Sequence, residues 1–188
     1  MLKRIERLWV YGAVPLALVL IAQAWILQGE WPQWFTPLFV LLPVYMLHQF
    51  DEWDNDRFRT FINAWLGRGR EAMTHRMSFI INVPGVWGTM VVAQALALHV
   101  DPGWGLIAVW LMLVNAGVHL IGIVLIRVPH PGLMTAMTLF PLAGIWALTS
   151  LNHAGATLTQ HLVALAIALA GHAMIGLSVK MRLASLPR

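Results

Sequence analysis

The sequence predicts an all-α integral membrane protein, a polytopic bundle of about six transmembrane helices with both termini in the cytoplasm. Of its 188 residues, 59% are hydrophobic and only 11% are charged. The mean hydropathy is +0.71, which is too apolar for a soluble domain. The basic residues cluster between alternate apolar runs. One helical domain over residues 1–188 is the simplest organisation that accounts for these observations.

Six apolar runs define the predicted membrane helices, at about residues 8–28, 36–53, 77–98, 104–127, 132–150 and 157–179. A helix needs about 20 apolar residues to cross a hydrocarbon core about 30 Å thick. The second and fifth runs are shorter, so we expect neighbouring helices or a locally thinner bilayer to accommodate them. Several runs contain proline, which membrane helices tolerate where a neighbour satisfies the freed carbonyl.

The distribution of basic residues gives the orientation. All twelve lysines and arginines fall on one side of a six-helix arrangement, whereas five or seven helices would scatter them. The positive-inside rule assigns that side to the cytoplasm, and we expect a bacterial inner (cytoplasmic) membrane. This placement at helix ends explains the net charge of +4 without nucleic acid as a partner. The absence of cysteine excludes disulfides, thiolate nucleophiles and cysteine-ligated metal sites.

Residues 57–70 form the one predicted amphipathic segment outside the membrane helices. Its apolar residues recur with the i, i+3, i+4 spacing of a helical face: Phe58, Phe61, Ile62, Trp65 and Leu66. Arginines flank this face, as in helices that lie flat in a membrane interface. Two interpretations stay open, a plain connecting helix or a sill over which a lipid enters the bundle.

Three histidines are predicted to lie at one depth. Each precedes the nearest following basic residue by eight or nine positions: His48 before Arg57, His119 before Arg127, and His172 before Lys180. At a rise of about 1.5 Å per residue, these histidines and Asn82, six residues after Arg76, lie roughly 9–14 Å inside the cytoplasmic boundary. Asn82 belongs to the same layer. Ionisable groups are costly inside a bilayer, so a shared layer of them indicates a functional site.

Two carboxylates accompany the first histidine. His48, Asp51 and Glu52 are spaced i, i+3, i+4 and share one helix face. Adjacent buried carboxylates repel each other, and no lysine or arginine is predicted at this depth, so a divalent cation or protons must neutralise them. Imidazole and carboxylate ligands suit zinc, iron or manganese. The candidate metal ligands, for one ion or two, are His48, Asp51, Glu52, His119 and His172.

The other polar residues have simpler expected roles. Asn82 and Asn115 are expected to link helices by hydrogen bonds, and Asn115, four residues before His119, is also placed to orient that histidine from a second layer. Five further histidines fall near predicted interfaces and are expected to be solvated: His75, His99, His130, His153 and His161. Inert alternatives stay open for the candidate ligands too. His48 and its carboxylates fit a solvated helix end, His119 a core histidine, and His172 helix packing.

These motifs resemble those of the HXXEE family of integral membrane proteins. The run His48-Gln49-Phe50-Asp51-Glu52 matches its His-x-x-Glu-Glu motif, with aspartate in place of the first glutamate. His119 occupies the place of the family's further histidine. In Pro129-His130-Pro131-Gly132, the Pro-Gly of the family's Tyr-x-Pro-Gly motif is present and the tyrosine is not. The resemblance covers about residues 40–150 and implies a membrane protein, suspected to be an enzyme, that holds a metal through His and Glu.

Three functions compete at this stage. The first is a metalloenzyme acting on a lipid or other apolar small molecule, hydrolytic with zinc or oxidative with iron, in which Asp51 and Glu52 are the catalytic carboxylates. The second is a metal-free acid–base isomerase or cyclase of a terpenoid- or sterol-like substrate. The third is a small proton-coupled transporter, disfavoured because no internal repeat is found. Membrane lipids are the expected surroundings, and a homodimer is compatible with each function.

Overall fold

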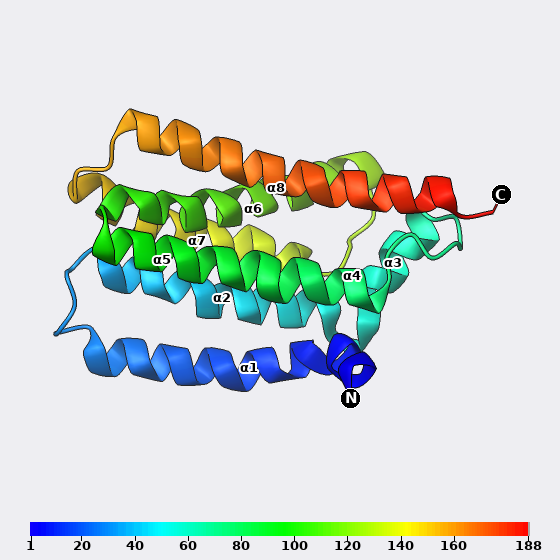
Figure 1. Ribbon diagram of the computed structural model, residues 1–188, viewed down its shortest axis with the longest axis horizontal. Coiled ribbons are helices and arrows are strands. Elements are labelled where there is room, and N and C mark those ends of the chain that lie inside the picture. Colours follow the sequence, from blue (N-terminus) through cyan, green and yellow to red (C-terminus); the bar gives the residue numbers. More distant parts are fainter. Residues whose placement is uncertain (188) are drawn as a thin grey trace.

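The computed structural model describes residues 1–187 and consists of helices that share one long axis (Figure 1). Five long elements are continuous α-helices: α1 (Leu2–Leu27), α2 (Phe35–Trp53), α6 (Leu106–Ile126), α7 (Leu133–His153) and α8 (Leu158–Ser185). The sixth is composite, with α4 (His75–Ile80), the π-helix η2 (Ile81–Trp87) and α5 (Gly88–His99) in succession. The short helices are η1 (Asp54–Asp56), α3 (Arg57–Trp65) and η3 (Pro102–Gly105). The predicted helix bundle is confirmed.

Both termini lie at the same end of the bundle, together with α3 (Figure 1). This arrangement agrees with the predicted pairing of the N- and C-termini on one side, and we call it the basic end. The first and last helices extend further toward it than predicted, starting at Leu2 and ending at Ser185. Their added turns carry Lys3, Arg4 and Arg182. Hydropathy alone excludes these residues from a membrane span, but they continue the two helices into the membrane interface.

Helix α2 differs from the other long helices in its surroundings. Within residues 1–187, five segments are long and apolar enough to cross a membrane, and α2 is not one of them. Its polar residues near the basic end lower its hydropathy, but α1, α5, α6 and α7 all pack against it. Protein therefore replaces lipid around most of α2, which lets this helix carry polar side chains at low cost.

Two sets of hydrogen bonds hold α2 against the composite helix. Pro43 has no N–H for the carbonyl of Phe39, and Gln94 of α5 donates to that oxygen at 3.4 Å and to Leu38 O at 3.3 Å. Nearer the basic end, the buried Gln49 donates to Asn82 Oδ1 at 2.9 Å and accepts from the Trp87 indole at 2.5 Å. These bonds fix the axial position of α2.

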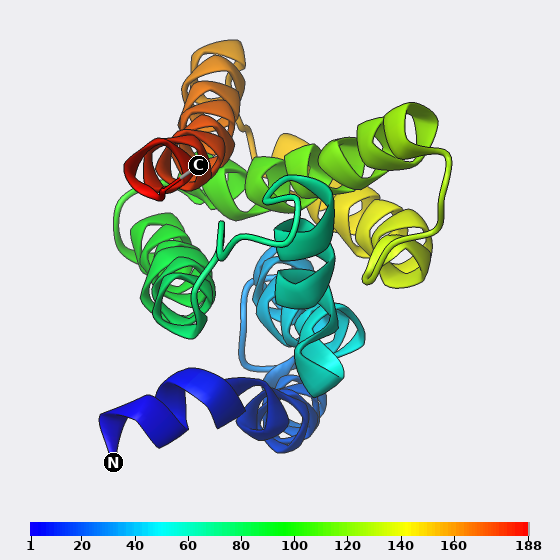
Figure 2. The ribbon, with the colours of Figure 1, turned by 90° about the vertical axis from the view of Figure 1, so that its right-hand side faces the viewer.

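Helix α3 lies across the basic end of the bundle (Figure 2). It ends at Trp65, earlier than the predicted segment, because Arg68 (φ +50°) and Gly69 (φ +86°) adopt left-handed conformations that stop a helix. The loop that follows is anchored by ion pairs of Glu71 with Arg59 (3.6 Å) and with Arg182 of α8 (2.9 Å). The predicted amphipathic segment therefore covers the helix ends.

Candidate metal centre

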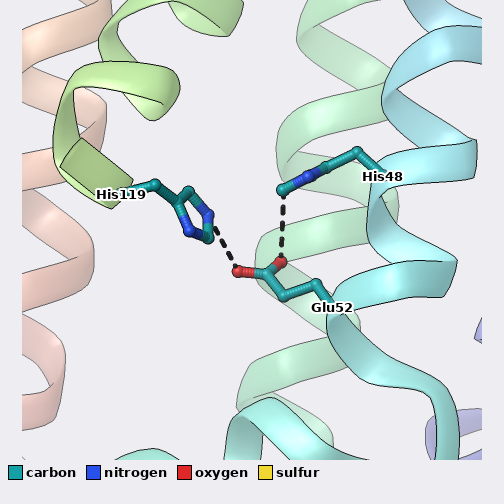
Figure 3. Close-up of side chains that lie close together, drawn as sticks. All are labelled: His48, Glu52 and His119. Atoms are coloured by element: carbon teal, nitrogen blue, oxygen red, sulfur yellow. Dashed lines mark ion pairs between the residues drawn. The ribbon is translucent and has the colours of Figure 1, made fainter. Parts of the chain in front are cut away.

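Three side chains converge inside the basic end: His48 and Glu52 of α2, and His119 of α6 (Figure 3). Glu52 lies between the two imidazoles, with Oε2 3.8 Å from His48 Nε2 and Oε1 3.4 Å from His119 Nε2. One potential ligand atom from each residue lies within 4.8 Å of the others. All three residues are buried. The structure thus brings together three of the five residues predicted as ligands.

The orientation of His48 is fixed by a residue of α7. His48 Nδ1 lies 2.8 Å from Thr135 Oγ1, and that hydroxyl lies 2.9 Å from Asp51 Oδ2 and 3.1 Å from Gly132 O. A hydroxyl has one hydrogen, and only oxygen acceptors surround it on this side, so Thr135 donates to an oxygen and accepts from His48 Nδ1. His48 is therefore the tautomer protonated on Nδ1, and its Nε2 carries a lone pair.

That Nε2 atom is buried and has no hydrogen-bond partner among the described residues. It faces the Glu52 carboxylate, so a lone pair and a negatively charged oxygen face each other away from water. A buried acceptor left in this state costs free energy, and a cation between the two atoms removes the cost. A cation or a proton between His48 Nε2 and Glu52 Oε2 is therefore compatible with this contact.

His119 has a second histidine behind it. Its Nδ1 lies 3.1 Å from His130 Nε2, and the two rings stack with an interplanar angle of 11°. Burial lowers the pKa of His130, and the nearby His119 lowers it further, which favours a neutral ring. The prediction that His130 is solvated is wrong, since only 8% of it is exposed. His130 lies in the Pro129–Gly132 run, and this run was the sequence signal from which a role for His130 in the site could have been predicted.

The Glu52 carboxylate is held from the opposite side by its neighbour Trp53, whose indole donates to Oε2 at 2.6 Å. Trp53 packs against Trp9 of α1 with ring centroids 6.0 Å apart. Phe140 of α7, fully buried, covers the His48 ring at a centroid distance of 4.3 Å. Aromatic side chains thus contact the carboxylate and the His48 ring.

Gly132 closes the site from the loop between α6 and α7. Its φ of +81° is a conformation that favours glycine, and a Cβ atom there would lie 2.9 Å from His48 Cε1, 3.0 Å from Glu52 Cβ and 3.0 Å from His119 Cε1. No side chain fits between these residues. The Pro-Gly run therefore has a clear structural role, because it brings backbone against all three candidate ligands.

The remaining predicted site residues lie around this group or apart from it. Asp51 is connected to His48 only through the Thr135 hydroxyl, which lies between the two side chains. Its Oδ1 lies 3.8 Å from Arg57 Nη2, so the expectation that no basic residue reaches these carboxylates is wrong for Asp51. His172 stands outside the group, with its Nδ1 2.8 Å from Ala168 O in the same helix.

The two asparagines link helices, as expected. Asn82 bonds Gln49 of α2 and donates to Ser78 O of its own helix at 2.8 Å. Asn115 donates to the Tyr45 hydroxyl at 2.6 Å, which joins α6 to α2. The described contacts of Asn115 do not include His119, whose second nitrogen faces His130 instead. The second layer of the site is therefore formed by Thr135, His130 and Trp53.

An apolar pocket of about 270 Å³ opens beside Glu52 and His119. Helix α3 contributes Phe58, Phe61, Ile62 and Trp65 to its wall. Five residues of α6 form the opposite wall: Val118, Ile121, Gly122, Leu125 and Ile126. The sill interpretation of residues 57–70 agrees with this position, because α3 borders an apolar space that reaches Glu52 and His119.

The donor set fits a divalent transition-metal ion. Two imidazoles and one carboxylate, two of them from an i, i+4 pair on a single helix, are the ligand types preferred by zinc and non-haem iron. Each imidazole is oriented through its other nitrogen by Thr135 or His130, as in metal sites whose ligands are positioned by an outer layer. His48 Nε2, which has no hydrogen-bond partner among residues 1–187, and the close approach of Gly132 to all three side chains are compatible with such an ion.

Comparison with known families agrees with these motifs. The family described as "protein of unknown function with HXXEE motif" matches residues 39–147, a range that contains the three convergent residues and Gly132. No curated protein and no solved structure matches the chain significantly. The match covers more than half of the chain, and the run His48-Gln49-Phe50-Asp51-Glu52 lies inside the matched range. The chain belongs to the HXXEE family.

Proposed function

We propose that this protein is a membrane-embedded, metal-dependent enzyme that acts on a lipid or another apolar small molecule. The observation that carries the proposal is the buried Nε2 of His48, which has no hydrogen-bond partner in the described part of the chain and faces the Glu52 carboxylate next to His119. A site with this composition at the inner end of an apolar pocket is typical of an enzyme whose substrate comes from the bilayer.

Each residue has a defined part in this proposal. His48, Glu52 and His119 would hold the ion. When bound, zinc supplies an activated water for hydrolysis, and iron supplies redox chemistry. Thr135 and Asp51 keep the lone pair of His48 Nε2 directed inward, and His130 contacts Nδ1 of His119 and so fixes the orientation of that ring. Glu52 lines the pocket and is the carboxylate placed to exchange a proton with a substrate or with the two histidines, whereas Asp51 reaches His48 through the Thr135 hydroxyl.

A metal-free acid–base enzyme is the competing function. It is favoured by one contact, the 3.4 Å separation of Glu52 Oε1 and His119 Nε2, across which a proton can be shared without an ion. The two functions differ in a simple observable, the metal content of the pure protein.

The deciding experiment is elemental mass spectrometry of the detergent-solubilised protein, beside a His48→Ala/His119→Ala double variant. We expect near-stoichiometric zinc or iron in the natural protein and its loss in the double variant. His153→Ala is the matched control, because this exposed histidine at the other end of α7 makes no contact with the site. Absence of metal from all samples, after expression with both metals supplied, would refute the metalloenzyme and favour the acid–base enzyme.

A further inference from the structure

The pocket between α3 and α6 is open toward the lipid-facing surface of the bundle. Three of its α6 residues are at once part of its wall and strongly exposed: Val118 (47%), Ile121 (60%) and Leu125 (71%). Trp65 on the α3 side is 47% exposed. In a membrane these surfaces contact acyl chains. A molecule dissolved in the bilayer can therefore enter the pocket sideways, near the basic end, without passing through water.

The lining of the pocket is apolar except at its inner end. The polar residues there are Glu52, Asn115, His119 and His130, and none of the lining residues in the described chain is lysine or arginine. Two arginines of α3 have acidic partners, Arg57 with Asp51 and Arg59 with Asp56. Apart from the ion of the proposed site, none of the described lining residues carries a positive charge that would offset the repulsion between the Glu52 carboxylate and an anionic head group.

Two of the polar side chains at the inner end, Asn115 and Glu52, offer hydrogen-bond acceptors. The amide nitrogen of Asn115 already donates to Tyr45, so Oδ1 is the atom of this amide that is left for a ligand. The carboxylate of Glu52 also accepts. A ligand whose polar end carries an uncharged O–H can donate to these atoms, whereas a carboxylate or phosphate end cannot.

We infer that the pocket takes a single-chain apolar alcohol, of the fatty or isoprenoid type, which enters laterally between α3 and α6 and places its hydroxyl at Glu52 and Asn115. This inference rests on the proposed function for the chemistry that follows binding. It specifies the substrate class further, because it excludes phospholipid head groups and free fatty acids from the inner end.

The test uses the full chain in lipid nanodiscs and two photoreactive probes, hexadecanol and hexadecanoic acid, each with the same mid-chain diazirine. After irradiation, peptide mass spectrometry locates the labelled residues. We expect the alcohol to label Phe58 and Phe61 of α3 about tenfold more than the acid does, which corresponds to about 1.4 kcal/mol of binding preference. Equal labelling by the two probes at these positions would overturn the assigned class.

Variants of α6 test the location. Val118→Trp places a large ring in the pocket and should reduce labelling of α3 about tenfold. Val124→Trp is the matched control, since Val124 is exposed on the same helix but does not line the pocket. Leu125→Trp provides a second pocket variant at a position 71% exposed, where a folding defect is not expected. Labelling that is unchanged in both pocket variants, or lost equally in Val124→Trp, would overturn the inference.

Metal content measured on the same samples separates this inference from the proposed function. Metal bound to the natural protein together with unselective labelling would overturn the substrate class and leave the metalloenzyme standing. Selective labelling by the alcohol in a protein that binds no metal would support the pocket assignment and refute the metalloenzyme.

Discussion

Helices α2 and α8 carry histidines predicted at the same depth, yet the structure uses them differently. His48 of α2 is fully buried, and its two ring nitrogens face Thr135 and Glu52 on either side. His172 of α8 faces the carbonyl of Ala168 in its own helix. Helix α2 packs against four long helices, whereas α8 is peripheral and buries few of its residues. Depth along a helix is thus readable from flanking charges, but the direction of a side chain around the axis depends on neighbouring helices.

The sharpest test of this contrast compares single histidine variants. His48→Ala and His119→Ala should each weaken metal affinity by about 100-fold or more, since loss of a ligand exceeds the 10–100-fold effect of an outer partner. His172→Ala should leave the affinity unchanged. Competition titration with a chromophoric chelator measures all three. A comparable loss of affinity in His172→Ala would show that α8 completes the site and would remove the contrast between the two helices.

The next test compares Gly132, in the loop beside the three convergent side chains, with Gly171 of α8. A Cβ at Gly132 would lie about 3 Å from all three candidate ligands, whereas a Cβ at Gly171 of α8 meets nothing within 4 Å. Gly132→Ala should lower metal affinity by at least about tenfold and, because of its positive φ, cost roughly 1–2 kcal/mol of stability. Gly171→Ala should be neutral or stabilising by up to about 1 kcal/mol. Chelator titration and thermal unfolding measure the two effects, and normal metal binding in Gly132→Ala would contradict the role of the loop.

Local sequence rules account for much of this fold and for part of the site. Hydropathy and the positions of basic residues predicted six helices and the shared end of the termini. The i, i+4 spacing placed His48 and Glu52 on one face, and depth added His119. Thr135 and His130 were not predicted as part of the site, because their contacts join parts of the chain that are apart in the sequence. Thr135 lies in the first turn of α7, and His130 lies in the loop between α6 and α7. Such contacts depend on tertiary packing, which leaves no periodic signal in the sequence.

The contacts of Asp51 and Glu52 explain why aspartate can replace the first glutamate of the motif. The final acidic residue, Glu52, is the one that joins the two histidines, whereas Asp51 points to Thr135 and Arg57. An aspartate at position 51 is long enough for the hydroxyl of Thr135. The first acidic position therefore orients a ligand here, and the second supplies one in the proposed site.

Removal of the Thr135 hydroxyl tests this orienting role. Thr135→Val keeps the shape of the side chain but removes the atom that joins His48 Nδ1 to Asp51, so His48 loses its fixed tautomer. We expect metal affinity to fall by about 10–100-fold with the fold retained. Thr138→Val is the matched control, because that exposed hydroxyl bonds only Met134 O one turn back in α7. Equal affinities in the two variants would show that packing alone orients His48.

The smallest effect is expected at the far end of the peripheral helix. Arg182 of α8 reaches Glu71 at 2.9 Å, but both side chains are partly exposed, and Glu71 keeps its contact with Arg59 when Arg182 is removed. Arg182→Ala should therefore cost only about 0.2–1 kcal/mol in thermal unfolding, less at high salt, and should leave metal affinity unchanged. A large loss of metal affinity in this variant would mean that α8 supports the site through the loop after α3. Helix α8 would then act on α2 at the basic end of the bundle, although its histidine, His172, lies outside the group of three convergent side chains.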